Sequence, residues 1–184
     1  MTTKTLSALT ILALAGVLAG CSGNHSADTE ADVFITVDIQ EGVADVNIGL
    51  PVDVAIQNMT FRSQAKAPGA ILSAQQDAIL TDWVVTASRA DGGTKASPQW
   101  RWYYNVTVPA GGQANLQNYR IFPSDYFREM PLSQLYPENG GIDVETGKRT
   151  IRQRLDVEVF GKTVSGRRLS VQFPVTVNFY YATP

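Results

Sequence analysis

Residues 151–181 read IRQRLDVEVFGKTVSGRRLSVQFPVTVNFYY, and this stretch decides the fold class. Apolar residues recur at every second position on both sides of Ser165-Gly166-Arg167. Such alternation is typical of strands with one buried and one solvated face, and the Ser-Gly pair favours a turn. We therefore predict a long antiparallel β-hairpin. Its core face consists of Ile151, Leu155, Val157, Val159, Leu169, Val171, Phe173, Val175, Val177, Phe179 and Tyr181.

Further strand-like segments precede the hairpin, each rich in β-branched or aromatic residues and separated from the next by Gly, Pro or polar turns. They cover residues 33–39, 43–48, 52–61, 79–90, 99–108 and 113–122. Seven or eight strands at this spacing predict an all-β, antiparallel sandwich. The pattern resembles immunoglobulin-like sandwiches in strand number, although the Cys…Trp…Cys signature is absent. Pro174 lacks an N–H donor, so its strand is expected at a sheet edge or at a bulge.

Residues 79–90 are apolar on both sides, which indicates a central strand. Strict alternation places Leu80, Val84 and Thr86 on one face, with Trp83, Val85 and Ala87 on the other. One short helix is expected within residues 124–135, and Pro131 limits it to one or two turns. Ser124 or Asp125 is the expected N-cap, and Glu129 is placed to complete a capping box.

The N-terminus carries a targeting signal. Lys4 precedes a short apolar run, residues 6–18, and small residues then lead into a cysteine. This run is too short to span a membrane, which takes about 20 apolar residues. The sequence Leu18-Ala19-Gly20-Cys21 closely resembles the lipobox of bacterial lipoproteins. The resemblance implies cleavage before Cys21, attachment of diacylglycerol to its thiol and acylation of the new amine.

The expected organisation follows from this resemblance and from composition. Residues 1–20 form the lipoprotein signal peptide, residues 21–32 a flexible polar tether and residues 33–184 the β-sandwich domain. Ser22 is not the aspartate that retains such lipoproteins at the inner membrane. In a Gram-negative host the resemblance therefore implies a lipid-anchored protein of the cell envelope at the outer membrane.

Composition and residue types exclude several chemistries. Lys and Arg number 15 against 17 Asp and Glu, for a net charge of −2, so no nucleic-acid partner is expected. The only histidine, His25, lies in the tether, where packing cannot hold it against a nucleophile. Lipidation of Cys21 removes thiolate chemistry. We therefore expect no enzymatic activity, no cofactor and no metal.

The aromatic run 99–104, QWRWYY, offers possible contact residues for a ligand or partner. On a strand, Trp100, Trp102 and Tyr104 share one face, and Tyr103 lies on the other. The favoured interpretation is that the Trp face fills the core, because such rings bury about 150–250 Å² each. The alternative is an exposed platform for a sugar ring or a partner protein.

A second candidate is the long loop 135–148, LYPENGGIDVETGK. Asn139, Asp143 and Glu145 offer oxygen ligands around Gly140-Gly141, but the order of an EF-hand loop is missing. Turn geometry alone favours Asn, Gly and Asp, so we interpret the loop as a solvated turn that offers contact residues.

The leading functional expectation is a membrane-anchored envelope lipoprotein that acts as a non-catalytic protein-binding or scaffolding module. Its partner would be an envelope protein, contacted by the exposed face and edge of the C-terminal hairpin or by the loop 136–148. The alternative is a carbohydrate-binding module for cell-wall or extracellular glycan that uses Trp100, Trp102 or Tyr103.

Overall fold

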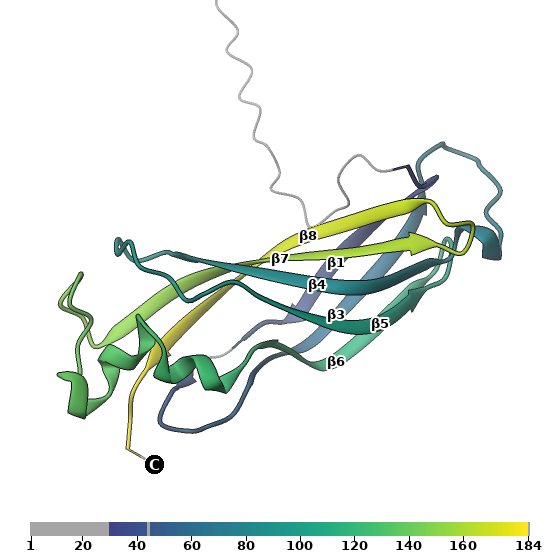
Figure 1. The fold of residues 1–184 in the computed structure, drawn as a ribbon. Coiled ribbons are helices and arrows are strands. Elements are labelled where there is room, and N and C mark those ends of the chain that lie inside the picture. The colour runs from purple at the N-terminus through teal and green to yellow at the C-terminus, as the bar shows by residue number, and fades with distance from the viewer. Residues whose placement is uncertain (1–29, 44, 184) are drawn as a thin grey trace, which may run out of the picture.

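The structure, a computed structural model, describes residues 30–43 and 45–183 and has two β-sheets packed face to face (Figure 1). The predicted all-β sandwich is confirmed. The strands are β1 (Val33–Glu41), β2 (Val46–Asn47), β3 (Val54–Ala65), β4 (Ala78–Arg89), β5 (Trp100–Val108), β6 (Gln113–Phe122), β7 (Thr150–Thr163) and β8 (Arg168–Tyr180). The smaller sheet has the order β1-β3-β6 and the larger β2-β8-β7-β4-β5. All neighbours are antiparallel except β2 and β8.

The predicted hairpin is the pair β7–β8, and its register confirms the expected core face from Ile151 to Phe179, whereas Tyr181 lies beyond β8 and is only partly buried. Val157 lies opposite Phe173, and the side chains of both are fully buried. Gln153 is a polar exception on the same face, where it is fully buried and donates to the Ser97 hydroxyl at 3.1 Å. Strand β2 pairs with β8 only at Phe179 and Tyr180, the last two residues of β8. Pro174 therefore has a single neighbouring strand, β7. Its expected position on a sheet edge is therefore confirmed.

The strict alternation expected along residues 79–90 is wrong. The register of β4 shifts between Leu80 and Asp82 against both of its neighbours, and against β7 the extra residue is Thr81. This bulge turns Leu80 and Trp83 toward the same interior, and both are fully buried. Gly161 lies opposite Leu80, and a Cβ there would overlap the carbonyl of Ile79. A glycine is therefore needed where β7 passes the bulge.

The expected short helix is divided into two 3₁₀ helices, η2 (Ser124–Arg128) and η3 (Leu132–Leu135), on either side of Pro131. The 3₁₀ helices η4 (Pro137–Asn139) and η1 (Ala74–Gln76) complete the set in the described part of the chain. The expected capping by Ser124 or Asp125 is wrong. The carboxylate of Asp53, the residue before β3, instead accepts from the Ser124 N–H at 2.7 Å and so stabilises the start of η2.

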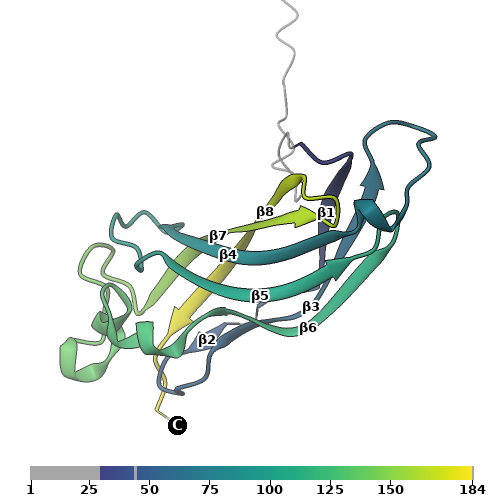
Figure 2. The same cartoon turned by 45° about the vertical axis from the view of Figure 1, so that its right-hand side comes forward.

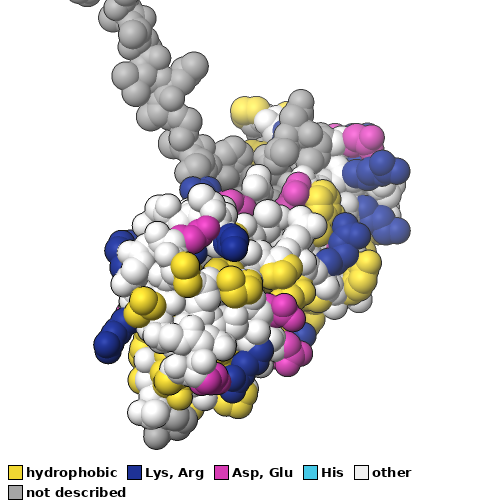
Figure 3. Space-filling model, turned by 60° about the vertical axis from the view of Figure 1, so that its left-hand side comes forward, with side chains coloured by type: hydrophobic (Ala, Val, Ile, Leu, Met, Phe, Trp, Pro, Cys, Tyr) yellow, Lys and Arg dark blue, Asp and Glu magenta, His cyan; other side chains and the backbone are white. Residues whose placement is uncertain are grey.

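Helices η2 to η4 gather at one end of the sandwich, beside the β4–β5 loop and the loop 140–148 (Figure 1). None of the helices formed by residues 30–43 and 45–183 is long and apolar enough to cross a membrane. On the face shown in Figure 3, basic and acidic side chains are interspersed. Exposed ion pairs in the described part of the chain include Arg154 with Asp156 at 2.9 Å. Each such pair stabilises the fold by about 0–1 kcal/mol.

Candidate ligand-binding groove between two sheet edges

Strands β5 and β6 are consecutive in the chain but belong to different sheets. Each is the outermost strand of its sheet, and the two do not pair with each other. Figure 2 shows them side by side along one side of the sandwich. Two hollows open along this seam, and we refer to them together as the seam groove. Its lining residues are Trp100, Arg101, Trp102, Tyr103, Tyr104, Gln117, Asn118, Tyr119, Arg120, Pro123, Asp125, Tyr126 and Glu129.

A backbone irregularity in β6 shapes the groove. Asn118 has a positive φ of 50°, a conformation that Asn tolerates better than most residues. Before it, Ala114 and Leu116 face the core; after it, Tyr119 and Ile121 are the buried residues. The alternation therefore changes phase at Asn118. Tyr119 is turned into the seam as a result.

Tyr119 fixes the aromatic side chains of the seam. Its ring lies 4.4 Å from that of Trp83 and 5.3 Å from that of Tyr104, measured between centroids. Its hydroxyl accepts a hydrogen bond from the Trp102 indole N–H at 2.5 Å. Burial raises the pKa of Tyr119 well above its usual value, so the hydroxyl stays protonated at any ordinary pH. Trp102 is therefore held in one orientation.

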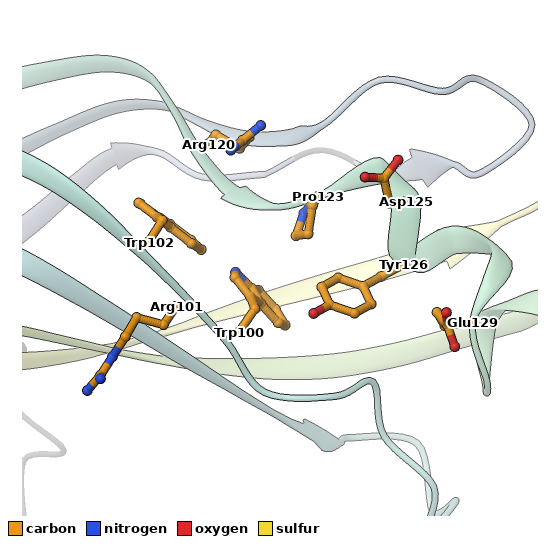
Figure 4. Close-up of a pocket in the computed structure, with 8 residues that line it drawn as sticks. All are labelled: Trp100, Arg101, Trp102, Arg120, Pro123, Asp125, Tyr126 and Glu129. Atoms are coloured by element: carbon orange, nitrogen blue, oxygen red, sulfur yellow. The ribbon is translucent and has the colours of Figure 1, made fainter.

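The first hollow, of about 380 Å³, lies between β5, the end of β6 and η2 (Figure 4). Trp100 forms part of its wall and is only 7% exposed, with its ring edge-on to Phe122 at 4.7 Å. Trp102 stacks nearly parallel to Trp100, with ring centroids 6.3 Å apart. Tyr126 approaches Trp100 from η2, at 5.7 Å between ring centroids. The wall of this hollow is therefore largely aromatic.

The two cations of the first hollow are already neutralised. Arg101 pairs with Asp82 at 3.1 Å, and Arg120 pairs with Asp53 at 2.9 Å. Burial raises the pKa of Asp53, but hydrogen bonds from the Ser124 N–H and Arg120 outweigh burial and lower the pKa below its usual value. The Arg120–Asp53 pair therefore persists at neutral pH.

Other polar groups of the first hollow have no partner among the described residues. The indole N–H of Trp100 is buried and makes no hydrogen bond. The carboxylates of Asp125 and Glu129 and the hydroxyl of Tyr126 form no ion pair or side-chain hydrogen bond within residues 30–43 and 45–183. Buried donors in native proteins are normally paired, so the Trp100 N–H calls for an explanation.

The second hollow, of about 320 Å³, adjoins the first and shares Trp102 and Arg120 with it. It is lined further by the exposed rings of Tyr103 and Tyr104 and by the side chains of Gln117 and Asn118. Tyr103 is 74% exposed and Tyr104 48% exposed. The aromatic run thus passes from a buried Trp100, through a half-buried Trp102, to exposed tyrosines.

The acidic loop takes a different role from the one that its composition suggested. Asp143 is fully buried, and its carboxylate accepts from Arg89 at 2.6 Å and from the Thr146 hydroxyl at 2.6 Å. Glu145 accepts from the backbone N–H of Thr94 at 2.6 Å. The expectation of a solvated turn is therefore wrong at Asp143. The buried Arg89 was missed, because no sequence signal links residues more than 50 positions apart.

Arg89, Asp91, Asp143 and Glu145 form a cluster that we call the Arg89 clamp. The Arg89 side chain is 1% exposed and pairs with Asp91 at 2.8 Å. Burial raises the pKa of Asp91, but hydrogen bonds from Arg89 and from backbone N–H groups outweigh burial and lower the pKa to about 2. The pKa of Asp143 is lowered in the same way. Arg89 is thus the cation among these carboxylates. Together these interactions hold the loop 140–148 against the β4–β5 loop.

The sequence-predicted site residues therefore separate into groups. Trp100, Trp102 and Tyr103 meet in the seam groove. Asn139 lies apart from the clamp and donates to the Ser133 carbonyl at 2.8 Å. Cys21 lies outside the described residues. No group of three or more His, Cys, Asp or Glu among the described residues is arranged to hold a metal ion.

Sequence reasoning missed the part of the groove that comes from β6 and η2. The sequence assigns Asp125 and Glu129 a capping role only, and no motif singles out Arg120 or Tyr126 as a contact for a ligand. No family model matches the chain, and no curated protein or solved structure matches it either. The function is therefore inferred from the side chains of the groove.

Proposed function

We propose that this chain is a bacterial envelope lipoprotein, anchored by lipid on Cys21, whose β-sandwich is a non-catalytic binding module with its ligand site in the seam groove. The lipobox-like sequence before Cys21 supports the anchor. The observation that carries the binding role is the first hollow, where aromatic walls surround polar groups without partners, Trp100 foremost. Such convergence is typical of ligand pockets.

The carboxylates of the groove do not favour catalysis. Asp125 and Glu129 are both exposed to solvent at the mouth of the first hollow. A carboxyl group that acts as a general acid near neutral pH needs a raised pKa, which comes from burial in an apolar environment or from a close negative charge. Exposed carboxylates instead serve as hydrogen-bond acceptors. This supports a binding role for the groove.

Of the two ligand classes that the sequence suggests, the lining of the groove favours the glycan. A sugar ring has apolar C–H faces that stack on aromatic rings, and hydroxyls that both donate and accept hydrogen bonds. The first hollow offers an indole donor at Trp100 and carboxylate acceptors at Asp125 and Glu129. An apolar peptide side chain would leave these groups unpaired, which costs binding free energy.

An envelope protein partner is the second candidate, and one observation favours it. Within residues 30–43 and 45–183, strand β8 has an open edge along most of its length, because β2 pairs with it only at Phe179 and Tyr180. Open edges accept a strand from another protein. Pro174 interrupts that edge by removing one donor, which shortens the stretch available for pairing.

A single set of full-length variants tests the proposal. We expect wild-type protein expressed in a bacterial host to incorporate an alkyne-labelled fatty acid and to sediment with membranes, and Cys21→Ser to do neither. In detergent, the wild type should bind insoluble cell-wall polysaccharide, and Trp102→Ala should lose most of this binding. Phe160→Ala removes an exposed aromatic ring outside the groove and serves as the matched control. Equal binding by all variants would place the ligand site elsewhere.

A further inference from the structure

The two hollows of the seam groove are adjoining parts of one site. They share Trp102 and Arg120, and each has a volume near the lower end of small-ligand pockets, about 380 and 320 Å³. The shared wall is rigid, because Trp102 donates to Tyr119 and stacks on Trp100. A ligand that extends past Trp102 therefore meets preformed surfaces in both hollows.

The wall of the first hollow includes a buried donor that has no partner among the described residues. Figure 4 shows the nitrogen-bearing edge of the Trp100 ring directed between Trp102 and Pro123, and the Tyr126 hydroxyl pointing toward Trp100. An unpaired buried N–H group destabilises a protein by about 1–3 kcal/mol. A ligand oxygen placed at this N–H would recover that free energy. Acceptors for the hydroxyls of the same ligand are present at the rim.

The charges of the groove favour a neutral ligand. The guanidinium groups of Arg101 and Arg120 are paired with Asp82 and Asp53 respectively, which reduces their attraction for an anion. The carboxylates at the rim repel an anion, and a cation would leave the Trp100 indole N–H without an acceptor. Uncharged groups that donate and accept hydrogen bonds meet no such penalty.

The second hollow repeats this chemistry in a more exposed form. Tyr103 and Tyr104 supply aromatic surface, and the amides of Gln117 and Asn118 each provide donors and an acceptor. Aromatic rings beside planar amides suit a second sugar ring better than a long apolar chain, which would bury the amides unpaired.

We propose that the seam groove binds a neutral glycan across two subsites, one in each hollow, so that the ligand has at least two linked sugar rings. This inference rests on the proposed function and names the ligand class and the minimum length of the ligand. The first subsite positions a ring through Trp100 and Trp102, and the second positions the neighbouring ring through Tyr104.

The test uses full-length protein in detergent micelles, titrated with cello- and chito-oligosaccharides of one to six rings and followed by calorimetry. A second ring that binds to an adjoining subsite raises affinity by about 100-fold over the monosaccharide. Tyr104→Ala should remove this gain, so that the oligosaccharides bind no more tightly than the monosaccharide. Trp100→Phe, which keeps a ring and removes the N–H, should weaken every member of both series by roughly tenfold. Phe160→Ala should bind as wild type, and circular dichroism checks that each variant is folded.

The outcomes separate the inference from the proposed function. Equal affinity for one ring and for four overturns the two subsites and leaves the groove as a binding site. Tighter binding of oligogalacturonides than of neutral oligomers overturns the neutral ligand. If no oligosaccharide binds while Trp102→Ala abolishes retention of an envelope protein, the glycan is wrong and the binding module stands. If no ligand responds to any groove variant, both the inference and the proposed groove fail.

Discussion

The Arg89 clamp and the seam groove both gather polar side chains in or beside the interior, yet they differ in how those groups are paired. In the clamp, Arg89 is 1% exposed and contacts two buried carboxylates, Asp91 and Asp143. In the groove, the buried Trp100 N–H has no partner among the described residues. A saturated network stabilises a fold and specifies one arrangement of it, whereas unpaired groups remain available to a ligand.

The two regions also differ in what they connect. The clamp joins the end of β4 to a loop more than 50 residues further along the chain. The groove lies between two consecutive strands that diverge into different sheets. Loss of the clamp should therefore affect the whole fold, while changes in the groove should affect binding. The predictions below test this division.

The largest effect is expected from Arg89→Met. Removing the guanidinium leaves Asp91 and Asp143 buried without their cation, and breaking a buried ion pair costs about 3–5 kcal/mol. Urea denaturation should show this loss in the free energy of unfolding. Arg154→Met removes one partner of an exposed pair, with Asp156, and should cost at most about 1 kcal/mol. Similar losses in both variants would mean that the clamp is no more stabilising than a surface ion pair.

Gly161→Ala should have the next largest effect. The added Cβ would overlap the Ile79 carbonyl and lie 2.9 Å from the Leu80 Cα, so β7 and β4 have to separate at the bulge. We expect a loss of about 3 kcal/mol, at the upper end for overpacking. At Gly42 a Cβ meets nothing within 4 Å, so Gly42→Ala is the matched control. A stable Gly161→Ala protein would show that the bulge tolerates a side chain.

Acid should weaken the clamp. The pKa of Asp91 is about 2 in the folded protein against 3.8 ordinarily, so its stabilisation is present above pH 4 and is lost as the pH falls from 4 to 2. The expected loss from Asp91 is about 2 kcal/mol, and Asp143 adds to it with the same sign. Denaturation curves recorded between pH 5 and pH 2 measure how the free energy of unfolding changes with pH. In Arg89→Met this pH dependence should be weaker.

The smallest effect is expected from isosteric changes in the groove. Asp125 forms no ion pair or side-chain hydrogen bond in the described structure, so Asp125→Asn should change stability by less than about 0.5 kcal/mol. Asp143→Asn, the same change inside the clamp, should cost about 1–3 kcal/mol because Arg89 loses a charged partner. Calorimetric unfolding of the two variants compares them directly. Equal costs would remove the distinction between the two regions.

Much of the fold was predictable because one-sided burial is recorded in the sequence as alternation. The hairpin β7–β8 shows this, since its inward residues from Ile151 to Phe179 are fully or almost fully buried. The prediction failed at Thr81, where one extra residue changes the phase of β4. A bulge leaves no mark in an apolar stretch, because either phase of such a strand looks buried.

The candidate site was only half predictable. The aromatic run identified Trp100, Trp102 and Tyr103, but the sequence offered core and platform as exclusive roles. The structure combines them, because the seam exposes Trp102 in part while Trp100 packs against Phe122. How far a ring is buried depends on where the neighbouring sheet ends, and a single strand does not carry that information.

The sequence by itself determined the all-β class and the core face of the hairpin, and it carries the lipobox-like signal on which the proposed anchor rests. These are local properties, encoded within one segment each. Only the tertiary structure decided that Arg89 meets Asp143, that Asn118 turns Tyr119 into the seam, and that two unpaired sheet edges leave a groove. Each of these depends on contacts between segments that are distant in the chain or in different sheets, and such contacts form only when the sheets pack.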